Sequence, residues 1–270
     1  MKKKFNVLLI GIVLISLFST CDKIDQPIKE GSVVWNGRKM LVYDFTGHKC
    51  IYCVRAHEEL DILKKTFGEN VVIPVAFHCT MFANVSSDIY NYDFRTEIGK
   101  ELADYYGFNS LPTGLVNSLA KEKLSNYSAW ATQIQSLISA FPEFTINITP
   151  KFDTDSTISA HINIITNIKN ARNLKLLVFL TEDNIKKPQK TETGDDENYV
   201  HNNVFRAGFN GTNGDIINSG NELSVNKEIN NQFSISAKSK DWNIDNCNIV
   251  AFVYDANSDE VLQVEKIRIR

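Results

Sequence analysis

Residues 40–53 read MLVYDFTGHKCIYC, and this stretch decides the fold of the first half of the chain. Its first part, Met40 to Thr46, is mostly apolar and predicts a short β-strand. Beyond the stretch, Gly68 ends a run of apolar residues that recur at helical spacing. That run consists of Cys53, Ala56, Leu60, Leu63 and Phe67. The sequence therefore predicts a strand that leads into a helix at a Cys-x-x-Cys motif.

Cys50 and Cys53 form that motif at the predicted start of the helix. The helix dipole and free backbone N–H groups stabilise a thiolate there, and Lys49 adds a positive charge. One helical turn brings the two sulfurs within bonding range. We expect the Cys50 sulfur to face solvent and attack a partner, and Cys53 on the buried side to resolve the mixed disulfide.

A Cys-x-x-Cys motif has other interpretations. Structural zinc needs two more ligands, but Cys79, Cys247 and the five histidines provide no second such motif. A permanently closed structural disulfide is the stronger alternative in an exported protein. Cys79 and Cys247 are predicted to be buried thiols, and a bridge between them stays open as an alternative.

Strand-like and helix-like patterns continue to alternate up to Pro142. A strand is predicted over 71–78 and a third helix over 130–141. Between them we expect a helix marked by Ile98, Leu102 and Tyr105 that stops at Gly107, then a hairpin built from Leu115-Val116 and a run near Leu124. The extra segment 81–95 is interpreted as a lid or rim over the motif, or as core packing. We therefore predict an α/β domain over 35–142.

After Pro142 the apolar residues alternate with period two. Short strands separated by Asn, Gly and Asp favour an antiparallel sandwich over 143–270. Residues 183–222 have no clear pattern. Strands are predicted at 144–148, 158–164, 174–180, 223–225, 233–237, 249–254 and 264–269.

Two further features make the first domain resemble a thioredoxin. Asp44 lies six residues before Cys50 in an apolar strand, where thioredoxins carry a buried acid that helps to move the proton of the resolving cysteine. Residues 106–113 resemble the segment that places a cis-proline, here Pro112, beside the motif. Such a bond leaves the preceding backbone free to pair with an extended substrate. The sequence departs from the thioredoxin pattern at Lys49, where tryptophan is usual.

The N-terminus predicts export. Lys2, Lys3 and Lys4 precede an apolar run over 7–18, which is shorter than the roughly 20 residues of a membrane span. Cys21 follows directly. The segment resembles a bacterial lipoprotein signal, which implies a signal peptide over 1–20 and lipid on Cys21. Residues 21–34 are then a tether.

The formal net charge of the chain is −3, so the protein has no overall basic field that would favour binding to nucleic acid.

The chain also resembles the thioredoxin-like lipoproteins related to the twenty-eight-kilodalton outer membrane protein of Gram-negative bacteria. The resemblance rests on Phe45-Thr46-Gly47, on YVHNNVFR at 199–206 and on CNIVAFVY at 247–254. It implies an outer-membrane lipoprotein with a thioredoxin-like domain and a β-rich C-terminal domain. The segment with His201 and Arg206 is interpreted as an interdomain brace or a partner surface, with packing favoured.

Two functions follow as hypotheses. The first is an envelope thiol–disulfide oxidoreductase or thiol-dependent carrier, whose partners are envelope proteins with thiols or disulfides and whose site comprises Cys50, Cys53, Asp44 and Pro112. The alternative is a surface binding protein or adhesin with a structural disulfide. We predict no cofactor and no metal, and we expect His48 to be an exposed loop residue without a role.

Overall fold

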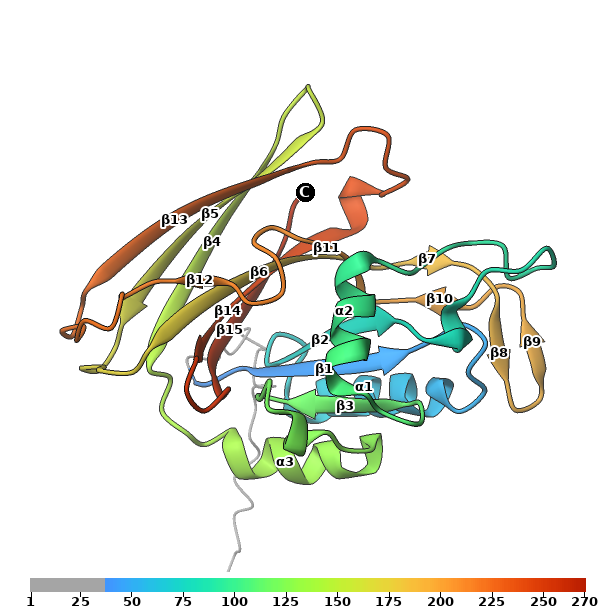
Figure 1. Cartoon of the computed structure of the whole chain (residues 1–270), viewed down its shortest axis with the longest axis horizontal. Coiled ribbons are helices and arrows are strands. Elements are labelled where there is room, and N and C mark those ends of the chain that lie inside the picture. Colours follow the sequence, from blue (N-terminus) through green and yellow to red (C-terminus); the bar gives the residue numbers. More distant parts are fainter. Residues whose placement is uncertain (1–36) are drawn as a thin grey trace, which may run out of the picture. The chain divides into compact units, whose positions relative to one another are not determined.

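Strand β1 (Met40–Thr46) has the bounds that the sequence predicts, and all of its residues are buried. The computed structural model describes residues 37–270 (Figure 1). The predicted signal peptide, Cys21 and the tether lie outside the described residues.

The structure is mostly β, with few helices. The helices are α1 (Cys53–Phe67), α2 (Glu97–Tyr106) and α3 (Trp130–Leu137). The strands after β1 are β2 (Val72–His78), β3 (Thr113–Val116), β4 (Phe144–Phe152), β5 (Thr157–Thr166), β6 (Leu174–Glu182), β7 (Ile185–Lys186), β8 (Gln189–Thr191), β9 (Gly194–Asp196), β10 (Val200–His201), β11 (Val204–Gly208), β12 (Asp215–Ile216), β13 (Glu228–Ser236), β14 (Cys247–Asp255) and β15 (Val261–Arg268). Short 3-10 turns lie at Met81–Ala83, Lys121–Lys123, Tyr127–Ala129 and Ile244–Asn246.

One large sheet runs through the protein in the order β15-β14-β6-β11-β2-β1-β3, and β12 pairs with β6. Strand β1 is parallel to β2 and antiparallel to β3. Strand β11 joins the two halves of the sheet, because it pairs with β6 and, at Val204 opposite Ala76, with β2. Strands from both predicted domains therefore share one sheet.

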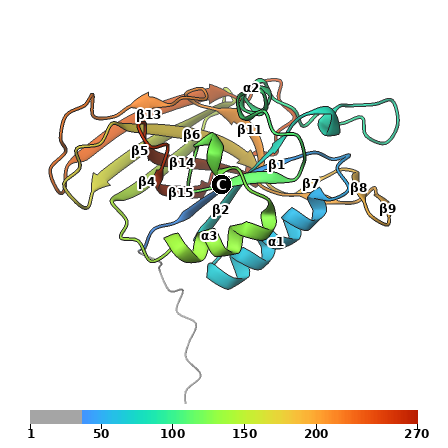
Figure 2. The same cartoon turned by 60° about the horizontal axis from the view of Figure 1, so that its bottom comes forward.

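The helices cover both faces of the β2-β1-β3 end of this sheet. Helices α1 and α3 lie on one face, where Leu60 and Trp130 belong to one apolar cluster, and α2 lies on the other face (Figure 2). Gly107 ends α2 with a left-handed φ of 56°, as its place in the sequence predicts. The buried tyrosine of α2 is Tyr106, whereas Tyr105 is 59% exposed.

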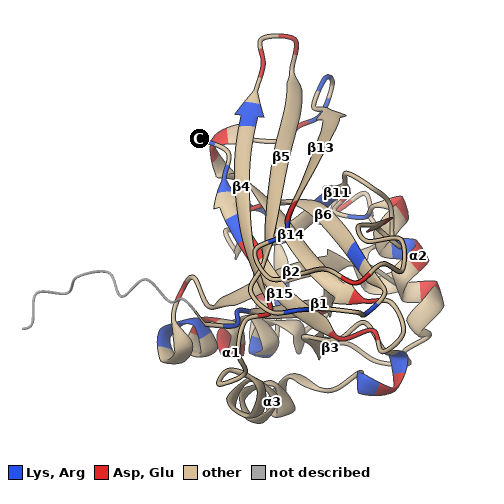
Figure 3. Cartoon of the chain, turned by 90° about the vertical axis from the view of Figure 1, so that its left-hand side faces the viewer, with Lys and Arg blue, Asp and Glu red and all other residues tan. Residues whose placement is uncertain are grey.

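A second sheet of order β13-β5-β4 packs on the β6-β14-β15 end of the large sheet through a second cluster, which includes Ile162 and Val178. The residues that alternate outward along its strands are mostly polar, and Figure 3 shows few Lys, Arg, Asp or Glu residues on these strands. Asn163 accepts a hydrogen bond from Asn147 across 3.2 Å and donates one to Asn230 across 3.0 Å. The β-rich character predicted for residues 143–270 is confirmed.

The apolar core crosses the predicted boundary at 142/143. The ring of Tyr43 lies 6.2 Å from the ring of Phe179, and that of Phe77 lies 4.8 Å from that of Phe205. The described residues, 37–270, all lie in one compact unit. The division into two domains that fold separately stays a prediction.

Sequence patterns fail where strands are short and polar. Strands β7 to β12 fall in the segment for which no strand is predicted. Conversely, the predicted strand at 223–225 contributes only a bridge from Leu223 to Asn170, and the hairpin expected near Leu124 reduces to a bridge between Gly114 and Ser125. Pairing partners, rather than local alternation, determine these elements.

Candidate functional site

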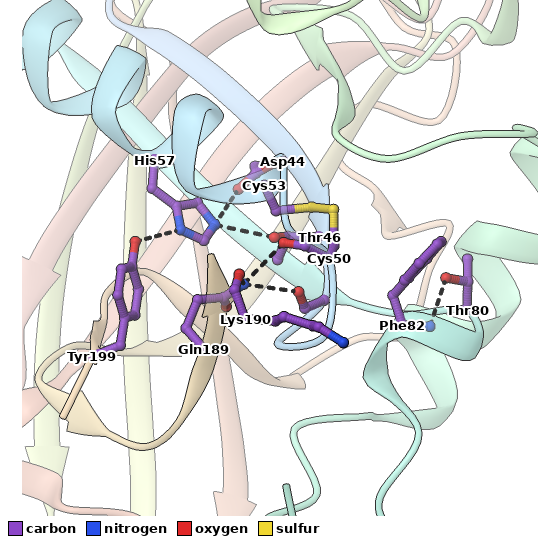
Figure 4. Close-up of a disulfide and its surroundings, with 11 residues drawn as sticks. Asp44, Thr46, Cys50, Cys53, His57, Thr80, Phe82, Gln189, Lys190 and Tyr199 are labelled. Carbon is purple, nitrogen blue, oxygen red and sulfur yellow. Dashed lines mark hydrogen bonds and ion pairs between the residues drawn. A yellow bond between two sulfur atoms is a disulfide. The ribbon is translucent and has the colours of Figure 1, made fainter. Parts of the chain in front are cut away.

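The Cys50–Cys53 disulfide lies where β1 gives way to α1 (Figure 4). The Cα atoms of the two cysteines are 5.4 Å apart, as one helical turn allows. The predicted proximity of the two sulfurs is therefore confirmed.

Both cysteines are buried: Cys50 is 3% exposed and Cys53 0%. The prediction that the Cys50 sulfur faces solvent is wrong, since the residue is almost completely buried. A hairpin from the second half of the chain lies against the loop that carries the motif. Gln189 donates a side-chain hydrogen bond to the carbonyl oxygen of Cys50 across 3.0 Å, and Lys190 donates its backbone N–H to the carbonyl oxygen of His48 across 2.7 Å. This hairpin is β8–β9, from the stretch that the sequence left without a strand.

The segment 81–95 forms a rim on another side of the motif. Lys49 donates its backbone N–H to the carbonyl oxygen of Phe82 across 2.9 Å, and its ammonium group donates to Ser86 across 2.8 Å. Gly47 permits this approach, since a Cβ at that position would lie 2.7 Å from backbone atoms of Phe82. The lid-or-rim interpretation and the packing interpretation both hold, because Phe94 of the same segment is buried.

His48 is 1% exposed, so the expectation of an exposed loop histidine is wrong. Its ring lies 5.3 Å from the ring of Tyr90 and 5.6 Å from that of Phe94. Its Nε2 lies 3.3 Å from the carbonyl oxygen of Asn84. Burial in this aromatic setting lowers the pKa of His48.

Asp44 is fully buried, as its apolar neighbours predict. Figure 4 shows its carboxylate beside Cys53. Neither carboxylate oxygen has a hydrogen-bond partner among the described residues, although Nε2 of His57 lies 3.4 Å from Oδ2. Asp44 therefore lies next to the disulfide without a hydrogen bond to its carboxyl oxygens from the described residues.

His57 connects Asp44 to the second half of the chain. Its Nε2 lies 3.0 Å from Oγ1 of Thr46, and its Nδ1 lies 2.7 Å from the hydroxyl oxygen of Tyr199. Sequence reasoning missed the role of His57 as a contact of Asp44. The available signal was its position one helical turn after Cys53, on the side of α1 that faces β1.

The peptide bond between Leu111 and Pro112 is cis, as the sequence predicts. Pro112 is buried and immediately precedes β3. Because Thr113 pairs with Phe45, Pro112 lies at the same edge of the sheet as the end of β1. Its contact with a substrate stays a prediction.

Cys79 and Cys247 are separate, buried thiols, so the bridge left open by the sequence does not form. Burial raises the pKa of each to about 12. Both thiols are therefore poor nucleophiles near neutral pH.

The segment around His201 and Arg206 packs in the interior of the protein, which agrees with the packing role favoured from the sequence. His201 is 2% exposed and Arg206 9%. The guanidinium of Arg206 lies 3.2 Å from Glu182 and 2.6 Å from Asp241, so the segment ties β11 to β6 and to the loop before β14.

These features define a disulfide-bearing, β-rich protein, and the comparisons give its family. Residues 99–270 match the family described as "Outer membrane protein Omp28", so the chain belongs to the Omp28 family. It is an outer-membrane lipoprotein of the cell envelope. Within residues 37–270 no helix is long and apolar enough to cross a membrane.

Solved structures that match this chain include two from Porphyromonas gingivalis. For "HBP35 of Porphyromonas gingivalis" the TM-score is 0.64 at 15% identity, covering 86% of this chain and 76% of that one; this likeness shows the fold alone. A domain of the outer membrane lipoprotein Omp28 from Porphyromonas gingivalis gives a TM-score of 0.32 at 18% identity, covering 48% of this chain and 91% of that one. No curated protein matches.

Proposed function

We propose that the chain is a binding protein of the outer membrane whose Cys50–Cys53 disulfide is structural. The burial of both cysteines, in a loop to which β8–β9 is hydrogen-bonded, carries this proposal. A disulfide that must exchange with partners needs an accessible sulfur, whereas one that fixes a loop does not. Here the Gln189 side chain and the Lys190 backbone lie over the loop that holds the motif.

The scaffold of residues 35–142 is, in this proposal, thioredoxin-like. The order β1-α1-β2-α2-β3-α3 supports it, with β2 parallel and β3 antiparallel to β1. The position of the disulfide at the start of α1 supports it as well. A fold of this kind does not by itself fix an activity.

A large cavity supports binding. Its volume is about 1250 Å³, and α2, β11 and the loop before β14 contribute to its lining. Phe108 and Trp242 supply apolar surface, while Lys100 and Arg206 supply charge. Asp93, Glu97 and Asp241 line it as well, so the cavity combines apolar surface with charges of both signs.

The reduction potential of Cys50–Cys53 tests the structural disulfide. We expect a value below about −300 mV and no reduction of insulin. A potential in the range of about −120 to −270 mV, together with insulin reduction, contradicts the proposal.

Photo-crosslinking from position 100 tests the cavity, with position 216 on the exposed β12 as the control. Crosslinks of equal yield from both positions contradict a ligand site at the cavity.

The second candidate is a thiol–disulfide oxidoreductase or thiol-dependent carrier of the envelope, with thiol- or disulfide-bearing envelope proteins as partners. The buried carboxyl group of Asp44 beside Cys53, which has no hydrogen bond from the described residues, favours it, since such a group can take up the proton of a resolving thiol. Cys53→Ser should then accumulate partners joined through Cys50 as reducible high-mass bands, and Cys50→Ser should not. Equal trapping by both variants removes this assignment of roles.

A further inference from the structure

Strand β13 is an edge of the β13-β5-β4 sheet, and β5 is its neighbour on one side. All nine of its residues pair with β5 in a continuous register without a bulge. Within residues 37–270, no backbone group of β13 hydrogen-bonds to an element other than β5. Figure 3 shows β13 at the margin of this sheet. One side of a long, regular strand is therefore left with unused backbone N–H and C=O groups.

The other edge strands of the two sheets carry features that hinder pairing with a further strand. Charge, proline, a bulge or short length are the usual means, because an unprotected edge pairs readily with other strands. Strand β4 carries Pro150 and Lys151. Strand β15 carries Lys266 and Arg268, and β3 has only four residues. Strand β13, with the sequence EINNQFSIS, has no proline and no basic residue, and its single acid is Glu228 at the first position.

The sequence of β13 is complementary to itself about its central residue, Gln232. In an antiparallel pair, residues that lie opposite each other share one face of the sheet. If two copies of β13 pair about a twofold axis at Gln232, all nine residues of each strand have a partner. Toward the core, Ile229 then lies opposite Ile235. On the outer face, Glu228 lies diagonally across from Lys238, which follows the strand and has the opposite charge.

The inward side chains of β13 are incompletely covered. Ile229, Phe233 and Ile235 pack against the second cluster but are only partly buried. The side-chain nitrogen of Asn231 is buried and has no hydrogen-bond partner among the described residues. A second β13 alongside covers the three apolar side chains. It also brings the two Asn231 side chains diagonally across the axis, where their amides can hydrogen-bond to each other.

We propose that the β13 edge is a dimer interface, at which two copies of the chain join their three-stranded sheets into one sheet of six strands. A twofold axis is the commonest symmetry of homodimers, and it lets the same strand serve both copies. A second copy is the occupant that the sequence favours, because the apolar and charged positions of β13 match those of β13 itself. The inference goes beyond the proposed binding function, since β13 contributes no residue to the lining of the large cavity.

Disulfide crosslinking in cells that express the full chain tests this interface. Gln232→Cys places the two new thiols opposite each other at the axis. The Cα atoms of opposite residues in an antiparallel pair are about 4.5–5.5 Å apart, which a disulfide can span. Ser234→Cys, on the same face of the same strand, is the matched control. Its two copies lie four residues apart along the paired strands, about 13 Å, which is too far for a disulfide.

We expect Gln232→Cys to give a reducible product with twice the mass of one chain, and Ser234→Cys to give none. Equal yields from the two variants overturn the proposal, as does the absence of this product from Gln232→Cys. Reducible products of other masses in place of the dimer show that the edge takes a strand of another protein, and they also overturn it.

Sedimentation of residues 22–270, the mature chain without its lipidated cysteine, gives an independent measurement. We expect twice the mass of one chain. Gln232→Lys sets like charges opposite each other at the axis and should shift the protein to the mass of one chain. His161→Lys changes the residue that pairs with Gln232 on β5, away from the edge, and should leave the mass unchanged. A wild-type protein with the mass of one chain contradicts the interface, and so does a Gln232→Lys protein that keeps twice that mass.

Discussion

Gln189 and Cys50 are joined by a hydrogen bond that spans 139 residues of the chain, from the Gln189 side-chain amide to the Cys50 carbonyl oxygen across 3.0 Å. The same amide lies 3.4 Å from the carbonyl oxygen of Gly47. Gln189 is itself fully buried. The Gln189 side chain and the Lys190 backbone together tie the β8–β9 hairpin to the loop that carries the disulfide.

Gln189→Ala should make the disulfide easier to reduce. The loss of one buried hydrogen bond, worth about 1 kcal/mol, should loosen the hairpin and speed reduction by dithiothreitol about fivefold. Lys186→Ala, at an exposed position of β7, serves as the control and should not change the rate. If Gln189→Ala reacts at the wild-type rate, the hairpin does not protect the disulfide.

Stability should fall as the pH drops below about 6.5, the ordinary pKa of histidine in an unfolded chain. Burial depresses the folded-state pKa of His78 and brings that of His201 to about 3. The unfolded chain therefore binds more protons between these values, and acid favours unfolding by about 1.4 kcal/mol per pH unit for each histidine. Urea unfolding at several pH values measures this slope.

His201→Gln should reduce the slope of the unfolding free energy against pH by about 1.4 kcal/mol per pH unit, which corresponds to one proton. His161→Gln should leave the slope unchanged, because His161 is exposed on β5. A slope that is the same in wild type and in His201→Gln contradicts the assignment.

The fragment 35–142 should be less stable on its own than within the whole chain. Tyr43 and Phe77 pack on Phe179 and Phe205, so the fragment exposes apolar surface that the intact core covers. Chemical denaturation of both proteins, with limited proteolysis around 140–150, measures the difference. A fragment as stable as the whole chain supports the predicted domain division and contradicts a shared core of energetic importance.

Cys21→Ala should release the protein from membranes, because the cysteine directly after the apolar run is the predicted site of lipid attachment. Detergent-free fractionation of cells that express the variant checks this. Cys79→Ala, at a buried cysteine of the folded part, is the matched control and should stay with the membrane fraction. A Cys21→Ala protein that remains membrane-bound shows that the anchor lies elsewhere.

The sequence by itself determined the elements whose signals are local. The bounds of β1, the helix that starts at Cys53 and ends at Gly68, and the burial of Asp44 follow from apolar spacing and from residues with special backbone preferences. The disulfide follows as well, since the turn that leads into α1 brings two cysteines three residues apart close together.

Only the tertiary structure decided what surrounds that disulfide. Gln189 donates a hydrogen bond to the carbonyl oxygen of Cys50, Tyr199 contacts His57, and β11 joins the two halves of the large sheet. Gln189 and Cys50 are 139 residues apart in the chain, and Tyr199 and His57 are 142 residues apart. Short polar strands such as β8 carry no periodic signal in the sequence. Their conformation depends on pairing with distant segments, so their location cannot be predicted from local sequence patterns.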